Sequence, residues 1–315
     1  MGMMPPGRFD REAAEAFLLD RSGPDVYSVT VLAEGAWSQA FAYRLGDRDL
    51  VIRFSALEEA FRKDEAASRY ASPTLPIPAI VEIGETPAGF YAISERRYGD
   101  VLETVDEAQM RALLPSIFAT LDAIRLADVS TTSGYGGWGP DGNAPHATWR
   151  AALLDVISDP ATHYHHGWRE RLAASPTGDG PFLEAYEQLE SVATDLPDDR
   201  HLIHSDLLNG NVLVDEDRIT AVFDWGSSMY GDFLLDLAWI CFWAPWSPAF
   251  RAIDFRQAAI DHYAAIGLDV PDFDRRLRAC ELWIGLDGQA YQAFKGRWDE
   301  LAWTAAHTLE IARGG

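Results

Sequence analysis

One stretch in the second half of the chain places polar side chains around a predicted β-hairpin. Residues 201–226 read HLIHSDLLNGNVLVDEDRITAVFDWG, in which the acidic turn at 215–217 joins the strand-forming runs NVLV and RITAVF. Because a hairpin returns the chain beside its own start, Asn211 and Asp224 at its two ends are expected to be neighbours. Two hard oxygen ligands of this kind suit a magnesium ion that is bound largely through the phosphates of a substrate. Asp206, one loop earlier, would face the same space and could accept a proton from an incoming hydroxyl group.

A simpler alternative is that these polar residues only shape the backbone. Asp and Asn side chains often cap turns, so Asp206 and Asn211 could cap one turn and Asp224 could begin another. We favour the site, because the residue types, their spacing and the hairpin geometry all agree with it.

The spacing of the apolar residues changes near residue 100, which predicts two different lobes. Before that point, the pattern predicts helices at 9–20 and 57–71 and strands at 28–33, 39–45, 50–54, 79–83 and 89–94. Beyond it, and interrupted only at 201–223, the pattern predicts helices at 107–127, 148–157, 182–194, 232–243, 255–265, 275–294 and 301–312. We therefore expect an α+β fold, with a small antiparallel sheet in an N-terminal lobe, residues 1–97, and a mostly helical C-terminal lobe, residues 98–315.

The chain carries a large excess of acidic side chains. It has 26 Lys and Arg residues against 49 Asp and Glu residues, a formal net charge of −23 at pH 7. Residues 1–97 contribute −4 to this charge and residues 98–315 contribute −19. Such a field repels nucleic-acid backbones and anionic membrane surfaces but attracts cations. The charge therefore disfavours a nucleic-acid partner and agrees with a cationic ligand, although a high net charge also serves solubility alone.

The sequence lacks the features of a membrane or secreted protein. No apolar run approaches the roughly 20 uncharged residues of a membrane-spanning helix, and residues 1–10 lack a basic region followed by an apolar stretch. We therefore expect a soluble, cytoplasmic chain with no membrane partner, and a monomer in preference to an oligomer. Cys241 and Cys280 lie in apolar helical contexts, which predicts free thiols rather than a disulfide or a thiolate metal site.

The motif H-x-D-x-x-x-x-N, formed by His204, Asp206 and Asn211, resembles the catalytic loop of kinases. The Asp-Trp-Gly after the hairpin resembles the kinase segment that carries a metal-binding aspartate. With the later YGDFLLDLA, the whole stretch is similar to that of the aminoglycoside phosphotransferase family. Further similar segments are SPTLPIP, SGYGGWGPDG, TWRAALLDVISDP and WIGLDGQAYQ, so the resemblance extends from about residue 30 to residue 295.

The resemblance implies a protein-kinase-like, two-lobed fold that binds a nucleoside triphosphate, ATP or GTP, together with Mg²⁺. It assigns Asp206 as the catalytic base, and Asn211 and Asp224 as the magnesium ligands. It also assigns Asp236 to holding the catalytic loop through backbone N–H groups, and the alternative for Asp236 is a carboxylate at a helix N-terminus. His204 is then expected to hold the loop rather than to donate a proton.

The nucleotide is expected to lie between the lobes, under the turn at 33–38. This turn has a single glycine, Gly35, so backbone N–H groups and the Ser38 hydroxyl would bind the phosphates. The base would lie against the segment between the lobes, at Ser94, Glu95 and Arg96.

The strand on which kinases carry a phosphate-binding lysine reads Val-Ile-Arg-Phe, with Arg53 at the place of the lysine. Arg53 keeps the positive charge and can fork two oxygens, although a guanidinium is not equivalent to an ammonium. Glu65 on the following helix is the first candidate to orient Arg53, and its neighbour Asp64 competes for that role. The alternative for Glu65 is an ordinary surface charge on a helix.

The resemblance implies transfer of the γ-phosphoryl group to a hydroxyl group of a small cationic molecule, foremost an aminoglycoside such as hygromycin B. Trp243 and Trp246 could flank this ligand, although tryptophans at helical spacing usually pack in a core. Acidic residues of the helical lobe would bind its ammonium groups, and the candidates are Asp155, Asp159, Asp232, Glu281 and Asp287, of which Asp232 and Asp287 lie within the similar segments. Other acceptors stay open, namely a macrolide, choline, homoserine or a sugar amine. A nucleotide-binding pseudokinase also stays open, because the strand lacks its lysine and the phosphate turn is poor in glycine.

Overall fold

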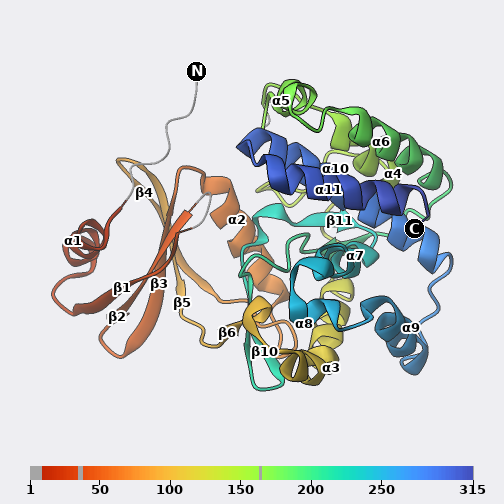
Figure 1. Ribbon diagram of the computed structural model, residues 1–315. Coiled ribbons are helices and arrows are strands. Elements are labelled where there is room, and N and C mark those ends of the chain that lie inside the picture. Colours follow the sequence, from red (N-terminus) through yellow and green to blue (C-terminus); the bar gives the residue numbers. More distant parts are fainter. Residues whose placement is uncertain (1–8, 35–37, 163–164, 315) are drawn as a thin grey trace.

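The computed structural model describes residues 9–34, 38–162 and 165–314. Figure 1 shows a sheet of five strands at one end of the molecule and a mostly helical body at the other. The predicted α+β fold, with an antiparallel sheet in the N-terminal lobe and a helical C-terminal lobe, is confirmed. The boundary at residue 97 stays a prediction.

The sheet of the N-terminal lobe is antiparallel throughout, in the order β1, β2, β3, β5, β4. Its strands are β1 (Val26–Glu34), β2 (Ser38–Leu45), β3 (Arg48–Ser55), β4 (Ile80–Thr86) and β5 (Gly89–Glu95). All five predicted strands are present, and only their ends differ, by a few residues.

The strict alternation of side chains along these strands gives the sheet two different faces. One face is bulky and apolar and packs against α1 (Arg11–Ser22), with the buried side chains Phe41, Tyr43, Ile52, Phe54 and Tyr91. The other face carries small side chains around Arg53, which pairs with Ala40 on β2 and with Ala92 on β5. This face therefore offers a smooth surface beside a positive charge.

The helix after β3 is shorter than predicted. α2 (Glu58–Ala67) continues only as a 3-10 turn over Ser68–Tyr70, before the proline-rich segment that follows. In Figure 1, α2 lies between the sheet and the helical lobe, so its side chains can contact both.

The helical lobe packs around one long central helix. α10 (Phe273–Lys295) contacts α5, α6, α7 and α11, and it is buried along most of its length. The other helices are α3 (Glu107–Arg125), α4 (Trp149–Leu154), α5 (Trp168–Ala174), α6 (Gly180–Val192), α7 (Leu234–Trp243), α8 (Pro248–Arg251), α9 (Phe255–Ala265) and α11 (Trp298–Ala312). The seven predicted helices of this lobe are present, although the one predicted at 148–157 ends as a 3-10 turn. The short helices α5 and α8 were not predicted, because one or two turns give too little apolar periodicity to recognise.

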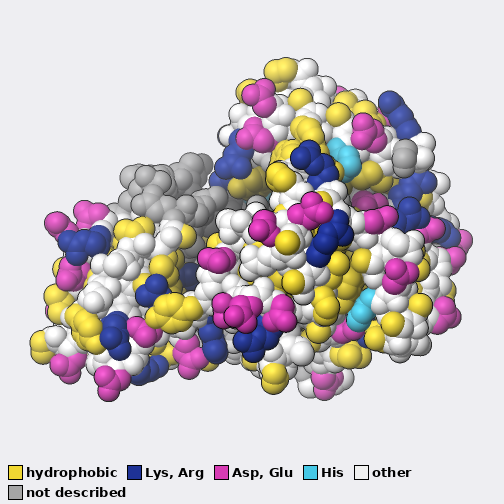
Figure 2. Space-filling view, turned by 60° about the horizontal axis from the view of Figure 1, so that its bottom comes forward, with side chains coloured by type: hydrophobic (Ala, Val, Ile, Leu, Met, Phe, Trp, Pro, Cys, Tyr) yellow, Lys and Arg dark blue, Asp and Glu magenta, His cyan; other side chains and the backbone are white. Residues whose placement is uncertain are grey.

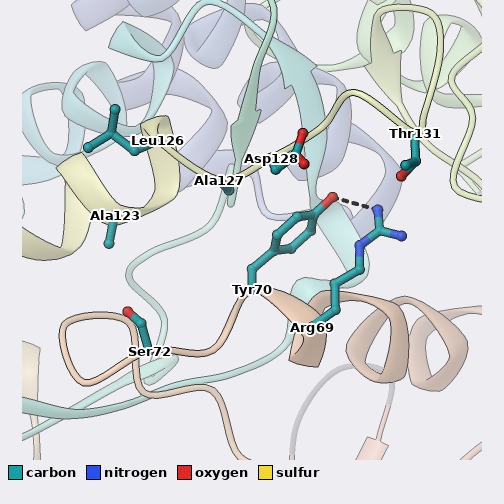
Figure 3. A pocket seen from close by; sticks show the side chains of 8 residues that line it. All are labelled: Arg69, Tyr70, Ser72, Ala123, Leu126, Ala127, Asp128 and Thr131. Carbon is teal, nitrogen blue, oxygen red and sulfur yellow. Dashed lines mark hydrogen bonds between the residues drawn. The ribbon is translucent and has the colours of Figure 1, made fainter.

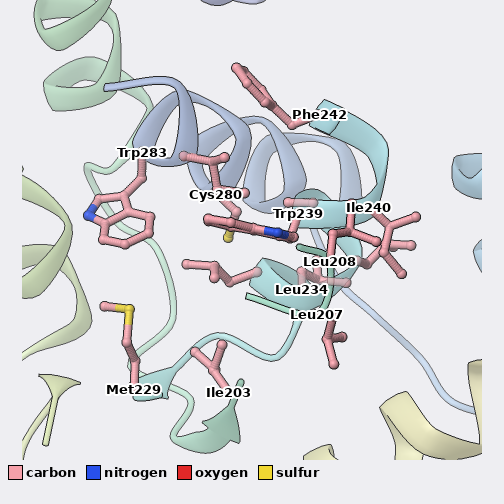
Figure 4. Close-up of a cluster of buried hydrophobic side chains, with 14 of the residues drawn as sticks. Ile203, Leu207, Leu208, Met229, Leu234, Trp239, Ile240, Phe242, Cys280 and Trp283 are labelled. Carbon is pink, nitrogen blue, oxygen red and sulfur yellow. The ribbon is translucent and has the colours of Figure 1, made fainter. Parts of the chain in front are cut away.

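Figure 4 shows the centre of this core, where α7 and α10 pack over Ile203, Leu207 and Leu208, the apolar residues around Asp206. The Trp239 ring of α7 lies beside Cys280 of α10. Cys280 and Cys241 are both free thiols, as predicted, and Cys280 is fully buried. The segment that carries Asp206 is therefore packed against a buried apolar core.

Two small three-stranded sheets flank the catalytic loop. The predicted hairpin is confirmed as β9 (Val212–Asp215) and β10 (Arg218–Val222), and β6 (Asp100–Val101) joins it at β9. The second sheet pairs β8 (His201–Ile203) with β11 (Met229–Gly231) and β11 with β7 (Gly136–Gly137). The strands β6, β7 and β11 were not predicted, because two or three residues show no alternation.

The surface carries charges of both signs. Figure 2 shows acidic side chains spread over both lobes on one face of the molecule, with lysines and arginines among them. Within the described ranges, no helix is both long enough and apolar enough to span a membrane.

Candidate active site

Asp206 lies in the loop between β8 and β9, with its carboxylate held by two amide groups. Asn209 Nδ2 donates to Asp206 Oδ1 at 2.7 Å, and Asn211 Nδ2 donates to Oδ2 at 3.1 Å. Burial raises the pKa of Asp206 well above its ordinary value, against the effect of these donors, and the nearby carboxylates of Asp224 and Glu103 raise it further. A carboxylate with a raised pKa is a stronger base near neutral pH, so the position and environment of Asp206 suit proton abstraction.

Asp236 holds the start of this loop from below. Its Oδ2 accepts the His204 N–H at 2.9 Å and its Oδ1 accepts the Ser205 N–H at 2.8 Å. Ser205 has φ 66°, a left-handed conformation that costs a non-glycine residue free energy and needs such support. The prediction that Asp236 accepts backbone N–H groups of the loop is therefore confirmed, and Asp236 also lies in the first turn of α7, as the alternative described.

His204 is a buried, neutral structural residue, in agreement with the prediction. Its Nδ1 accepts the Asp206 N–H at 3.2 Å, which leaves Nε2 to donate to the Phe223 carbonyl at 3.1 Å. The ring also meets the Trp225 indole edge to face, with the centroids 4.6 Å apart. Burial lowers the pKa of His204 to about 4. His204 thus joins the catalytic loop to the segment that carries Asp224.

This low pKa predicts a pH-dependent stability. Between the ordinary pKa of 6.5 and the folded value of about 4, the unfolded chain binds a proton at His204 that the folded chain excludes. The folded state is therefore most stable, as far as His204 is concerned, above pH 6.5. Its free energy of unfolding decreases as the pH falls from 6.5 toward 4. We expect His204→Asn to reduce the difference in unfolding free energy between pH 7 and pH 4.5 by about 2 kcal/mol, measured by urea denaturation. An unchanged difference between pH 7 and pH 4.5 in a folded His204→Asn variant would contradict the assignment.

Asn211 and Asp224 form the part of the site that fits a divalent cation. The Phe223 N–H donates to the Asn211 carbonyl at 3.1 Å, so the hairpin brings Asn211 beside the residue that precedes Asp224. Asn211 Nδ2 also donates to the Asp206 carbonyl at 2.8 Å, which fixes the amide and leaves Oδ1 available. No described residue donates a hydrogen bond to the Asp224 carboxylate or to Asn211 Oδ1. Two available oxygen ligands fit Mg²⁺ that takes its remaining ligands from phosphates and water.

The described residues hold no cluster of three or more His, Cys, Asp or Glu side chains that could bind a metal by themselves.

Arg53 reaches across from the sheet to the Asp224 side of the site. Its guanidinium forms an ion pair with Asp64 of α2 and lies over the Phe61 ring, 5.1 Å from the centroid. Burial disfavours the charged guanidinium, but the fields of Asp64 and Asp224 outweigh this effect and raise the pKa of Arg53. Asp64 Oδ1 also accepts the Trp225 N–H at 2.7 Å. A single carboxylate therefore connects Arg53 to the segment after Asp224.

The prediction that Glu65 orients Arg53 is wrong, and its competitor Asp64 has that role. Consecutive residues of a helix point about 100° apart, so only one of the two can face the sheet. Asp64 is buried, whereas Glu65 is exposed and pairs with Arg62 of its own helix at 3.1 Å. Glu65 is the surface charge that the alternative described.

The residues predicted to contact the nucleotide divide between the two faces of the sheet. Ser38 pairs with Ser55, and Ser94 pairs with Val51, so both serines lie on the small-residue face with Arg53. Residues 35–37 of the predicted phosphate turn, including Gly35, lie outside the described residues.

Glu95 does not fit its predicted role as a side chain. It pairs with Leu50, which places its side chain on the face opposite Arg53, where it is exposed and forms an ion pair with Arg97 at 3.2 Å. Its N–H donates to the Ala79 carbonyl. Arg96 donates its N–H to the Asp49 carbonyl at 3.1 Å, and its side chain lies over the Tyr98 ring. Ser38, Ser94 and Arg53 share one face of the sheet and therefore support the predicted nucleotide site. Glu95 and Arg96 give it less support.

Two of the acidic residues predicted to bind the acceptor are structural. Asp232 is buried and forms a two-pronged ion pair with Arg276, at 2.8 and 2.9 Å, so it has no capacity left for a ligand. Asp159 accepts the backbone N–H groups of Gly167 and Arg169 at the start of α5. The structure contradicts the prediction for Asp232 and Asp159, because both carboxylates are largely buried and already bound to groups of this chain.

The other three acidic candidates differ in their surroundings. Asp155 accepts a hydrogen bond from the Ser158 hydroxyl and is half exposed. On α10, burial raises the pKa of Asp287 to about 6 and that of Glu281 to about 7. Asp287 accepts no hydrogen bond from the described residues and is only partly buried, so it stays open to a ligand.

Two residues near the site were not predicted. Glu103 Oε1 accepts the Gly210 N–H at 2.7 Å, which holds the catalytic loop from the side of β6, and its Oε2 is buried without a partner among the described residues. On α10, burial raises the pKa of Tyr291; Arg297 opposes this effect and the field of Asp206 adds to it. Neither residue has a sequence motif around it that could have indicated its place.

A separate pocket lies away from these residues. Figure 3 shows it between the 3-10 turn after α2 and the end of α3, where Arg69 donates a hydrogen bond to the Tyr70 hydroxyl. None of its lining residues belongs to the site described above.

The chain is similar to several known proteins over nearly its whole length. The profile of a family described as "Phosphotransferase enzyme family" matches residues 28–268. The hygromycin-B 4-O-kinase of Escherichia coli is 36% identical over 306 residues, which cover 96% of this chain and 85% of that protein. A thermostable mutant of aminoglycoside phosphotransferase APH(4)-Ia, solved as a ternary complex with AMP-PNP and hygromycin B, superposes with a TM-score of 0.83 at 34% identity and covers 96% of this chain and 99% of its own.

A more distant structure shares the fold alone. The GDP complex of aminoglycoside 2'-phosphotransferase-IIIa has a TM-score of 0.65 at 15% identity, over 97% of this chain and 99% of that chain.

Proposed function

The chain belongs to the phosphotransferase enzyme family, and from that premise we propose that it transfers the γ-phosphoryl group of ATP or GTP to a hydroxyl group of hygromycin B. The observation that carries the chemistry is the convergence of Asp206, Asn211 and Asp224 at one end of the β9–β10 hairpin. The similarity of nearly the whole chain to a hygromycin-B kinase supports hygromycin B as the acceptor. We place the reaction in the cytoplasm, with the nucleotide between an N-terminal lobe at 1–97 and a C-terminal lobe at 98–315.

The proposed reaction needs positioning and charge stabilisation rather than a covalent enzyme intermediate. Asp206 would align the acceptor hydroxyl and take its proton as the oxygen bonds to the γ-phosphorus and the bond to the leaving nucleoside diphosphate breaks. Arg53 would balance phosphate charge from the sheet side, and Ser38 would donate to a phosphate oxygen. Mg²⁺, held by Asn211 and Asp224, would neutralise the charge on the phosphates. Hydrogen bonds hold Asp206 and Asn211, and an ion pair holds Arg53, before a ligand arrives, which favours electrostatic catalysis.

The proposed acceptor site lies between the catalytic loop and α10. Asp287 is available there for an ammonium group, and its neighbour Gly288 lies next to the Trp243 ring, because a Cβ at Gly288 would come within 3.5 Å of it. Trp243 also meets Trp246, with centroids 4.9 Å apart, and Trp246 meets Trp303 at 4.4 Å. Trp246 keeps 47% of its surface exposed. The exposed Trp246 ring would cover a sugar face or attract a cation, and Asp287 on α10 would bind an ammonium group, which together suit a polycationic sugar.

The test is mass spectrometry of the acceptor after incubation with Mg-ATP or Mg-GTP. The panel contains hygromycin B, other aminoglycosides, a macrolide, choline and homoserine. We expect hygromycin B to gain one phosphoryl group. If no acceptor is modified although the nucleotide binds, the proposed function is wrong, and a product with the mass of a nucleotidyl group would show a different transfer.

Arg53 is expected to affect the nucleotide more than the acceptor. Loss of its charge-assisted hydrogen bonds in Arg53→Ala should raise the KM for the nucleotide by roughly 10- to 100-fold, and Arg53→Lys, which keeps the charge, should raise it less. Arg48→Ala, at the exposed start of the same strand, is the matched control and should behave as the wild type. Steady-state kinetics with each substrate varied in turn measures both effects, and an unchanged nucleotide KM in Arg53→Ala would remove Arg53 from the site.

A further inference from the structure

Lys63 is a buried lysine on α2, pointing into the helical lobe. The chain has only two lysines, and Lys63 keeps 4% of its surface exposed. Its Nζ donates to the Gly226 carbonyl at 2.7 Å and to the Ser228 carbonyl at 3.1 Å. The ammonium also lies 4.7 Å from the centroid of the Trp138 ring. Each of its partners belongs to the helical lobe, although Lys63 follows the N-terminal sheet in the chain.

Lys63 acts beside Asp64 on the same short segment of backbone. Asp64 accepts the Trp225 N–H at 2.7 Å, and Lys63 donates to the carbonyls of Gly226 and Ser228. Two consecutive residues of α2 therefore hold three of the four residues that follow Asp224. We name residues 225–228 the post-aspartate turn.

The backbone at Asp224 needs this support. Asp224 has φ 63°, a left-handed conformation that is unfavourable for a residue with a Cβ. The post-aspartate turn also lies tightly against α2, because a Cβ at Gly226 would come within 3.5 Å of the Ala60 Cβ and within 3.4 Å of Asp224 Oδ1. The direction of the Asp224 carboxylate is thus set by a turn that α2 holds in place.

Stability alone does not explain an ammonium at this position. Burial lowers the pKa of Lys63 to about 8, which shows that the fold disfavours its charge. A methionine of similar length would fill the space without desolvating a charge. What the methionine could not do is hold two carbonyl groups of the post-aspartate turn at fixed positions.

We infer that Lys63 is a positioning residue that orients Asp224 toward the metal-nucleotide complex by holding the post-aspartate turn against α2. Lys63 touches neither the substrate nor the metal in this role. The inference rests on the proposed function, because it concerns the magnesium site of that reaction.

The test compares nucleotide binding with and without Mg²⁺ in Lys63→Met. We expect calorimetry to show that Mg²⁺ increases the affinity for the nucleotide about 10-fold less in this variant than in the wild type, while the affinity in EDTA stays unchanged. The Mg²⁺ concentration for half-maximal transfer should rise accordingly, and the KM for hygromycin B should not. Lys63→Arg, which keeps a cationic donor, should recover part of the effect. Arg62→Met, one residue earlier on the exposed side of α2, is the matched control and should match the wild type.

Each outcome decides the inference. A Lys63→Met variant with a lower melting temperature but an unchanged Mg²⁺ effect on nucleotide affinity would show a purely structural role and overturn it. If this variant does not fold, Lys63→Gln, which keeps one donor, is measured in the same way. A wild type that binds Mg-nucleotide but transfers no phosphoryl group would tell against the proposed function, whereas the binding comparison would still test Lys63.

Discussion

Replacing Asp206 with asparagine is expected to stop phosphoryl transfer while the protein stays folded and still binds its nucleotide. An amide of the same size cannot take the proton of the acceptor hydroxyl, and general-base catalysis typically contributes about 10²- to 10⁴-fold to a rate. We expect kcat to fall by that amount, with little change in the KM for the nucleotide. Initial rates, a melting curve and calorimetric nucleotide binding measure the three properties separately.

The control for this prediction is Asp215→Asn on the same hairpin. Asp215 is exposed at the end of β9, so this variant loses the same charge without touching the site. It should keep wild-type activity. A fully active Asp206→Asn variant would show that another group takes the proton, and a variant that has lost nucleotide binding would show that Asp206 acts mainly on the loop.

Asp224→Asn is expected to remove the dependence of nucleotide binding on magnesium. The substitution takes away the only negatively charged ligand of the proposed pair with Asn211, and a neutral amide oxygen holds Mg²⁺ far more weakly. We expect the gain in nucleotide affinity on adding Mg²⁺ to disappear in calorimetry. The transfer rate should fall on the order of 10²- to 10³-fold, the size of losing one electrostatic contact in a catalytic site.

Asp217→Asn provides the matched control, since Asp217 is an exposed aspartate in the turn of the same hairpin. It should retain the full magnesium effect. If Asp224→Asn also retains the gain in nucleotide affinity on adding Mg²⁺, the metal lies elsewhere and Asn211 and Asp224 are not its ligands.

Local patterns predicted most of the fold and the centre of the site. The hairpin could be predicted because its turn, its strands and its polar ends lie within one continuous stretch, so geometry alone places Asn211 beside Phe223. The alternation of β2 and β3 likewise predicted the sheet. The strands β6, β7 and β11 could not be predicted, because each is defined by its partner rather than by its own residues.

The errors within the site share one physical cause. Whether Asp64 or Glu65 faces Arg53 depends on the rotation of α2 about its axis, which is set by packing against the helical lobe. Asp232 is engaged by Arg276, which lies 44 positions later in the chain. Lys63 and Glu103 hold backbone groups that are more than a hundred residues away. Sequence patterns report local chemistry, whereas these roles depend on which residues, distant in the chain, the fold brings into contact.

The attachment of α2 to both lobes has a consequence for control of the enzyme. Moving α2 away from the helical lobe would break the three hydrogen bonds that Lys63 and Asp64 form with the post-aspartate turn, and a hydrogen bond to a charged group contributes about 1.5–3 kcal/mol. A displaced helix would then be populated at roughly 1% or less. The fold therefore favours a single arrangement of the post-aspartate turn and of Asp224 beside it. We therefore expect phosphoryl transfer to need no separate step that first moves α2 into place.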